Sequence, residues 1–135
     1  MQRVYEEAPL ARGTNRYEDV QMATKAMARF ARISPRKARM IADLVRGKSA
    51  AQALQMLQFV NKSGAPWLKK VIESAVANAR HANPGVDVDS LYVSAATVDK
   101  GPNAHMRRWR PRAMGRATRV QKGISHITVV LDTRD

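Results

Sequence analysis

The feature that most limits how this chain can fold is a basic segment without any acidic residue, residues 100–131. Pro102, Pro111, Gly101 and Gly115 leave little room in it for a helix. Its eight basic residues and single tryptophan are Lys100, Arg107, Arg108, Trp109, Arg110, Arg112, Arg116, Arg119 and Lys122. Such charges repel one another in a free chain and are stabilised by a dense polyanion, most commonly nucleic acid. A disordered basic tail is the alternative, but the alternating apolar run that follows favours an ordered, extended element.

The composition of the whole chain points to the same class of partner. The 135 residues carry a net charge of +13, and a chain of this length predicts one domain. This charge favours RNA, DNA or an anionic membrane surface as partner. The membrane is the weakest of these, because no apolar run approaches the roughly 20 residues that span a bilayer. We expect no signal peptide, since the first residues lack an apolar core and a basic start. The absence of cysteine excludes disulfides and thiolate metal sites and fits a reducing compartment.

Three helices are expected between residues 34 and 82. Ser34 and Pro35 form a start signal for the first helix, and Gly47 ends it. Ser49 can cap a second helix, and Pro66 opens a third, which stops at residues 83–85. Apolar residues at helical spacing predict the buried faces, and they are Ala38, Ile41, Ala42 and Val45, then Ala53, Leu54 and Leu57, then Leu68, Val71, Ile72, Ala75, Val76 and Ala79.

The period of the sequence changes to two after Val86. Leu91, Val93 and Ala95 are expected on one face, and the runs 88–99 and 118–131 are expected to pair as antiparallel strands. The basic segment between them is then the tip of a long β-hairpin, which projects roughly 30 Å at about 3.3 Å per residue. The stretch 21–33 is ambiguous, because alternation and helical spacing both fit it and propensity favours a helix. Alternation would place Ala26, Ala28 and Phe30 on one side of a strand.

Enzymatic chemistry is poorly supported. His81, His105 and His126 have no metal-ligand spacing, so we expect neither a metal nor a cofactor, and packing or hydrogen bonding is the expected use of His81 and His126. Asp87 and Asp89 are expected to share one face of a strand start as solvated carboxylates. Because no phosphate-binding glycine loop or activated nucleophile is present, we expect no enzyme.

Four stretches of this sequence resemble one known family. They read ISPRKARMIADLVRGKS, ANARHAN, GPNAHMRRWRPRAMGRA and SHITVVL, in the family's order and close to its spacing. Over roughly residues 23–132 the chain is similar to the bacterial type of the large ribosomal subunit protein twenty-two family. The resemblance implies an α+β fold: a small antiparallel three-stranded sheet packed with three helices, plus a long protruding β-hairpin. It also implies a strand at residues 25–33 and a single domain at 23–135 with the hairpin tip at about 100–118. Residues 1–22 are expected to form a flexible extension for another reason, because the first 19 residues lack periodicity.

The resemblance further implies a structural constituent of the large ribosomal subunit in the cytoplasm. The implied partners are large-subunit rRNA, neighbouring large-subunit ribosomal proteins and the nascent peptide, with no membrane and no homo-oligomer. The hairpin is expected to line the peptide exit tunnel, to affect macrolide antibiotics, and to support subunit assembly. RNA contacts would map to Lys25, Arg29, Arg32, Ser34, Arg36, Lys37, Arg39 and Lys48 in the body, and to Lys100, Arg107, Arg108, Trp109, Arg110, Arg112, Arg116, Arg119 and Lys122 in the hairpin. The tunnel-lining tip would be Met106, Arg107, Arg108, Trp109 and Arg110.

The chain departs from the family pattern in two places. Ala104 and His105 look like an insertion before the basic run, so the resemblance does not fix which side chain lies at the tunnel constriction. The lead of residues 1–22 is longer than usual.

An architectural DNA-binding protein is the alternative from another class, because the first two helices could imitate a helix-turn-helix. The arginines of the first helix speak against it, since they begin at the helix start instead of following one exposed face.

Overall fold

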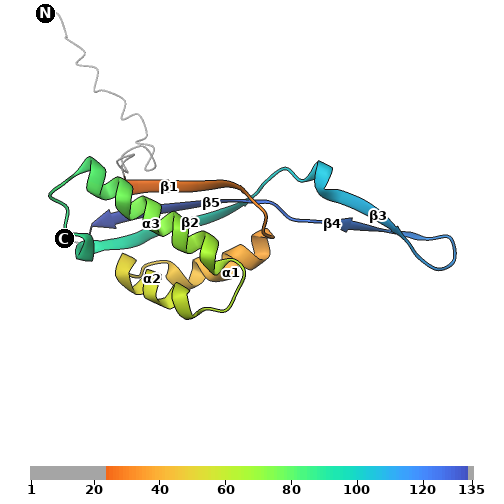
Figure 1. Ribbon diagram of the computed structural model, residues 1–135, viewed down its shortest axis with the longest axis horizontal. Helices are drawn as coiled ribbons and strands as arrows, with labels where there is room; N and C mark the ends of the chain where they lie inside the picture. The colour runs from red at the N-terminus through yellow and green to blue at the C-terminus, as the bar shows by residue number, and fades with distance from the viewer. Residues whose placement is uncertain (1–23, 134–135) are drawn as a thin grey trace, which may run out of the picture.

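The structure, a computed structural model, describes residues 24–133 and has the predicted α+β architecture. A three-stranded antiparallel sheet has the order β1-β5-β2, and a separate two-stranded ribbon is formed by β3 and β4. Figure 1 shows the helices gathered on the body and the ribbon extending away from it. The elements are β1 (Lys25–Ala31), α1 (Pro35–Val45), α2 (Ala50–Phe59), α3 (Ala65–Ala82), β2 (Leu91–Lys100), β3 (Arg107–Pro111), β4 (Ala117–Gln121) and β5 (Ser125–Thr133).

The three predicted helices are confirmed: α1 and α2 start directly after the predicted caps, and α3 starts at Ala65, one residue before the predicted Pro66. Ser34 precedes α1, and Ser49 precedes α2, where its hydroxyl accepts a hydrogen bond from the Gln52 N–H at 3.3 Å. The predicted faces are buried, except that Leu54 and Val76 are only half-buried beside the core. Helix α1 packs mainly against β2, and α3 packs against β1 and β5. The central strand β5 buries every second side chain: Ser125, Ile127, Val129 and Leu131.

The ambiguous stretch forms strand β1, as the resemblance implied, and pairs with β5. The predicted alternation holds for Ala26 and Ala28 but is wrong at Phe30, which is 58% exposed. The ladder register shifts between Ala28 and Ala31, and Phe30 has a positive φ of 56°. A bulge of this kind turns a side chain to the other face, so Ala31 takes the buried position instead.

The pairing of the last two long strands is confirmed, but the predicted start of the first is wrong. Residues 88–90 form a short 3₁₀ turn, and the Asp87 carboxylate accepts a hydrogen bond from the Asp89 N–H at 3.1 Å. Asp87 and Asp89 therefore do not share a strand face. Ala95 does not share a face with Leu91 and Val93 either, because a register shift between Val93 and Ala95 inverts the alternation. Ala96 and Val98 are the residues buried beyond it.

The long hairpin is divided into two ladders. The β2–β5 ladder ends with Lys100 opposite Ser125, and the β3–β4 ladder runs from Arg107 opposite Gln121 to Pro111 opposite Ala117. Between the ladders lie residues 101–106 and 122–124, here called the joint. The ribbon is β3, β4 and the turn 112–116 between them. The predicted extension at residues 1–22 lies outside the described residues.

We expect Ile72→Ala to lower the free energy of unfolding by about 2–4 kcal/mol, because the Ile72 side chain is fully buried and its removal leaves a cavity. Urea unfolding of the full chain measures the change. Phe59→Ala is the matched control, since Phe59 is 86% exposed on α2 and its removal leaves no cavity. Equal stability of the Ile72 variant and the parent would contradict the assigned core.

Candidate nucleic-acid interface

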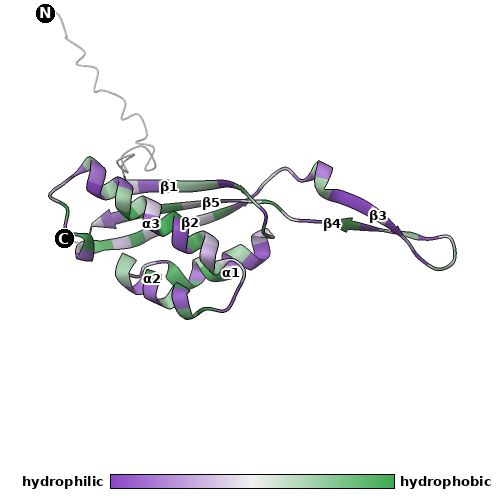
Figure 2. Ribbon diagram, viewed as in Figure 1, coloured by the Kyte–Doolittle hydropathy of each residue, from purple (hydrophilic) through white to green (hydrophobic). Residues whose placement is uncertain are grey.

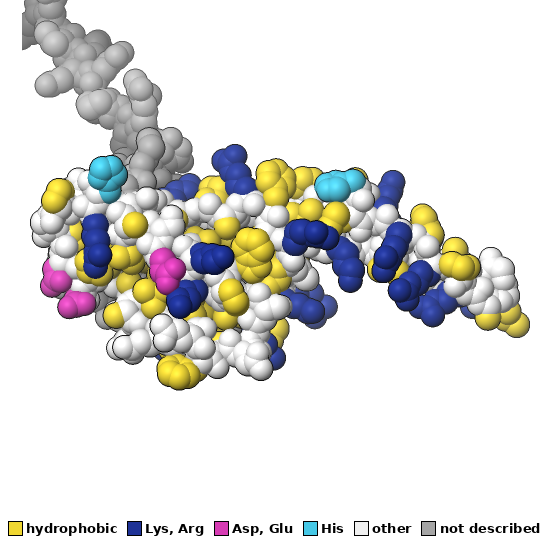
Figure 3. Space-filling model, in the orientation of Figure 1, with side chains coloured by type: hydrophobic (Ala, Val, Ile, Leu, Met, Phe, Trp, Pro, Cys, Tyr) yellow, Lys and Arg dark blue, Asp and Glu magenta, His cyan; other side chains and the backbone are white. Residues whose placement is uncertain are grey.

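The ribbon presents its whole length to solvent. Every residue from 107 to 119 is exposed, and no acidic residue lies among them. Within residues 24–133, the two ion pairs join Asp43 to Arg46 and Glu73 to Lys69, so neither of them neutralises a ribbon arginine. Figure 3 shows dark blue side chains along the ribbon, and in Figure 2 β3 is mostly hydrophilic, whereas hydrophobic residues run along the strands of the body. The charge of the ribbon is therefore available to a partner.

A second group of basic residues lies on the body, along β1, in the first turns of α1 and just after the end of α1. We call the predicted residues there the body surface: Lys25, Arg29, Arg32, Ser34, Arg36, Lys37, Arg39 and Lys48. All are exposed except Ser34 and Lys48, which are half-exposed. Arg39 has a second use, because its Nε donates a hydrogen bond to the Val98 carbonyl at 3.0 Å.

The joint brings the two basic groups together. A pocket of about 370 Å³ lies there, with Arg32 and Lys37 of the body surface on one side and Lys122 on the other. Its remaining lining residues are Ile33, Ser34, Ser63, Met106, Gln121 and Gly123. A side chain at Gly123 would place its Cβ 2.9 Å from the Ser34 Cα, so only glycine allows this close approach to the start of α1. Three cations from separate parts of the chain therefore face one cavity.

Hydrogen bonds hold the outer side of the joint. The Asn103 amide donates to the Lys122 carbonyl at 3.1 Å, and the Gln121 amide donates to Asn103 Oδ1 at 2.9 Å. The Lys122 N–H donates to the Met106 carbonyl at 3.1 Å, which brings the two chain segments together again before the ribbon begins.

The inner side of the joint is fixed by two polar side chains of β5. Ser125 is fully buried, and its hydroxyl donates to the Ile33 carbonyl at 2.6 Å. His126 Nδ1 accepts from the Phe30 N–H at 3.0 Å, and the two rings meet edge to face with centroids 4.8 Å apart. The predicted role of His126 in packing and hydrogen bonding is confirmed. The role of Ser125 was not predicted, although a polar residue at a buried position of an alternating apolar run could have suggested it.

The predicted tunnel-lining residues do not occupy the end of the ribbon. Met106 lies in the joint, and Arg107, Arg108, Trp109 and Arg110 belong to β3. The far end is the turn 112–116, where the Arg112 N–H donates to the Arg116 carbonyl at 2.7 Å. Met114 is 90% exposed there, and Met114 and Gly115 both have positive φ. The exposed Met114 was not predicted, although the following Gly115 is a residue type typical of a turn.

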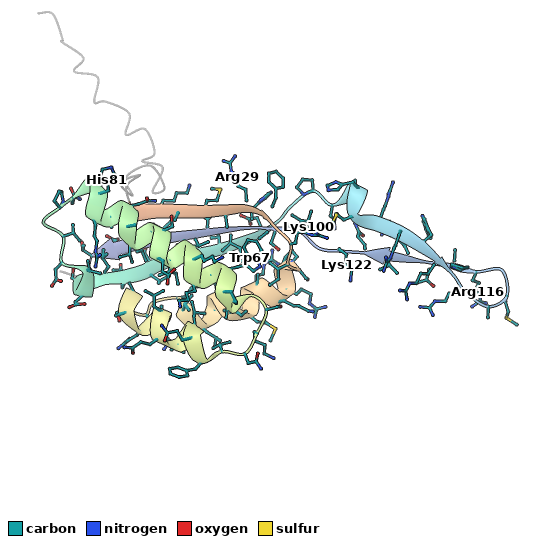
Figure 4. All side chains as sticks on the ribbon, viewed as in Figure 1. Arg29, Trp67, His81, Lys100, Arg116 and Lys122 are labelled. Carbon is teal, nitrogen blue, oxygen red and sulfur yellow. The ribbon has the colours of Figure 1, made fainter. Side chains whose placement is uncertain are left out.

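Figure 4 shows the spread of the predicted residues. Lys100 and Lys122 lie where the ribbon leaves the body, Arg116 lies toward its far end, and Arg29 stands on β1. His81 lies on α3 as predicted, far from the joint.

The side chain of Arg46 binds other parts of the body. Its Nε and Nη2 donate to the Ala96 carbonyl at 2.9 and 2.7 Å, and its Nη1 pairs with Asp43 at 2.6 Å. Arg39 and Arg46 therefore donate hydrogen bonds to the carbonyls of Val98 and Ala96 in β2. Strand β2 is an edge strand of the sheet.

The described part of the chain contains no cluster of three His, Asp or Glu side chains able to hold a metal ion. Among residues 24–133, no helix has the length and apolar character needed to cross a lipid bilayer.

We expect Arg46→Gln to lower the free energy of unfolding by about 1–2 kcal/mol, because the Ala96 carbonyl loses a charged donor. Arg36→Gln removes the same charge from an exposed site and should change stability by less than about 0.5 kcal/mol. Urea unfolding of both variants makes the comparison, and equal stabilities would show that the Arg46 bonds contribute nothing.

A family profile and individual relatives both assign the chain to the same family. The profile of the family described as Ribosomal protein L22p/L17e matches residues 26–132. Large ribosomal subunit protein uL22 of Sorangium cellulosum (strain So ce56) is 66% identical over 113 residues, which cover 84% of this chain and 99% of that protein. The protein of the same name from Syntrophobacter fumaroxidans (strain DSM 10017 / MPOB) is 50% identical over 110 residues, which cover 82% and 97%. The chain therefore belongs to the ribosomal protein L22p/L17e family.

Proposed function

We propose that this chain binds large-subunit rRNA through the body surface and the ribbon together, lines the nascent-peptide exit tunnel with the ribbon, and supports assembly of the subunit. As a member of its family it is a structural, non-enzymatic constituent of the large subunit of the cytoplasmic ribosome. The observation that carries the proposal is the ribbon, which is exposed throughout except at the half-buried Val120 and whose arginines have no carboxylate partner among the described residues.

The two basic groups suit a folded RNA better than a straight duplex. Contacts from Arg and Lys to phosphates position a protein without reading base sequence. The body surface and the ribbon extend in different directions from the joint, so one partner must offer phosphates along both. A folded RNA has such a shape, and its strands can enter the pocket at the joint, where Arg32, Lys37 and Lys122 converge.

The family assignment also speaks against the architectural DNA-binding alternative. The arrangement of α1 agrees, because Arg39 bonds to β2 and does not stand free on a recognition face.

The proposed tunnel contact uses the same ribbon. Met106 and the β3 residues Arg107 to Arg110 remain the proposed tunnel-lining set, with the exposed Met114 at the end of the ribbon as an addition. A positively charged wall suits a passage for nascent chains because it presents no long apolar surface to which a passing peptide would adhere. Neighbouring ribosomal proteins are the further proposed partners.

Replacing Arg107, Arg108 and Arg110 together by Gln should make the salt dependence of rRNA binding shallower. If each arginine neutralises one phosphate, the slope of log K against log salt becomes less negative by about 2–3. Filter binding of the full chain to purified large-subunit rRNA at a series of salt concentrations measures the slope. The matched control replaces Lys69, Lys70 and Arg80 of α3 by Gln, and an equal change in the control would contradict binding through the ribbon.

The same triple variant should change macrolide sensitivity when it is the only copy of this protein in the cell, because the shape and charge of the proposed tunnel wall change. The minimum inhibitory concentration of a macrolide provides the measurement, with the α3 triple variant as control. If subunits that contain the ribbon variant keep the parent's sensitivity, the ribbon does not lie at the drug-binding part of the tunnel.

A further inference from the structure

The two faces of the ribbon present different chemistry. Side chains alternate between the faces along each strand, and residues opposite each other in an antiparallel ladder share a face. The register therefore defines two sets. The Trp109 face consists of Arg107, Trp109, Pro111, Ala117, Arg119 and Gln121, and the opposite face consists of Arg108, Arg110, Thr118 and Val120.

Trp109 has two arginines as neighbours on its face. Arg119 lies directly across the ladder from it, and Arg107 lies two residues before it on the same face. The indole is 65% exposed, and no helix covers the ribbon in the described chain. The ring contact between Phe30 and His126, on β1 and β5 beside the joint, does not involve Trp109, and the Trp109 ring has no aromatic partner within residues 24–133.

This arrangement defines the kind of partner that fits the Trp109 face. A large flat apolar ring fits a flat apolar surface, and the two neighbouring arginines need negative charge beside that surface. An unpaired nucleotide has both, since its base stacks on an aromatic ring and its phosphates accept from guanidinium groups. A peptide would need an aromatic residue between two acidic ones to offer the same pattern.

We infer that the Trp109 face holds one unpaired nucleotide of the rRNA, with its base stacked on the indole and its neighbouring phosphates bound by Arg107 and Arg119. The inference rests on the proposed function and assigns base contact to one of the two ribbon faces. The opposite face has equal charge, from Arg108 and Arg110, but it offers Thr118 and a half-buried Val120 in place of a ring. It is suited to phosphates, and not to a base.

The first experiment uses the affinity of the full chain for two polyanions. The probes are an unstructured single-stranded RNA, followed by fluorescence anisotropy, and inorganic polyphosphate of matched charge, followed by competition. Trp109→Leu should weaken RNA binding by about 5- to 150-fold, the range for loss of one stacked base, and leave polyphosphate binding unchanged. Trp109→Phe keeps a ring and should retain most of the RNA affinity.

A second measurement observes the ring directly. The chain has two tryptophans, so Trp67→Phe leaves Trp109 as the only one. RNA should quench its emission by stacking, while polyphosphate should bind with little quenching. In this background, Arg107→Gln with Arg119→Gln should reduce the quenching at saturating RNA, whereas Arg108→Gln with Arg110→Gln removes the same charge from the opposite face and should preserve it.

The outcomes separate this inference from the proposed function. If Trp109→Leu binds RNA as tightly as the parent, the stacking site is overturned while RNA binding stands. If the parent binds neither rRNA nor the RNA probe at moderate salt, the proposed function itself fails. Quenching by an aromatic, acidic peptide and not by RNA would assign the Trp109 face to the nascent chain and overturn the inference.

Discussion

The positive charge of the ribbon cannot be neutralised from within the described chain, and this constraint governs the rest of the structure. Placing such charge in the core of the body would require burying unpaired guanidinium groups, which is far more costly than leaving them in water. The apolar residues therefore gather in the helices and the three-stranded sheet, and the charged ladder extends beyond them. A two-stranded ribbon has little stability of its own. If the ribbon binds rRNA as we propose, its order depends on that polyanion, and folding of the ribbon is linked to binding of the partner.

Because the ribbon has low stability of its own, its direction must be fixed by the body. The contacts at the joint fix it. Ser125 and His126 of β5 bond to the backbone of Ile33 and Phe30, at the bulged end of β1. Gly123 lies against the start of α1, where a larger residue would collide with backbone. The positive φ of Phe30 costs on the order of 1–3 kcal/mol. Because the bulge turns this residue toward His126, that strain is offset by contacts that orient the ribbon relative to the body surface.

Sequence patterns predicted the helices well, because caps and apolar stripes are local signals. Ser34 with Pro35, Ser49, and the stripe of α3 each depend on a few neighbouring residues. The strands were harder, since register depends on partners far along the chain. The bulges at Phe30 and at residues 93–95 left no clear mark in the sequence, and they reversed the expected faces of Phe30 and Ala95. The division of the hairpin into two ladders also went unpredicted, because the close approach of Gly123 to Ser34 is a long-range contact.

The arginines of the body have two different roles, which residue type alone does not distinguish. Strand β2 is an edge strand, and free carbonyls at an edge invite pairing with another chain. Arg39 and Arg46 lie seven residues apart, on the side of α1 that faces β2, and bond to the carbonyls of Val98 and Ala96. Nearer the start of β2, Val93 exchanges two hydrogen bonds with the backbone of Gly47 and Lys48, at 2.9 Å each. Part of the basic character of α1 thus protects a sheet edge, whereas Arg36 and Lys37 of the same helix remain exposed for a partner. Helical periodicity separates the two uses once the edge strand is known, and neither composition nor net charge can do so.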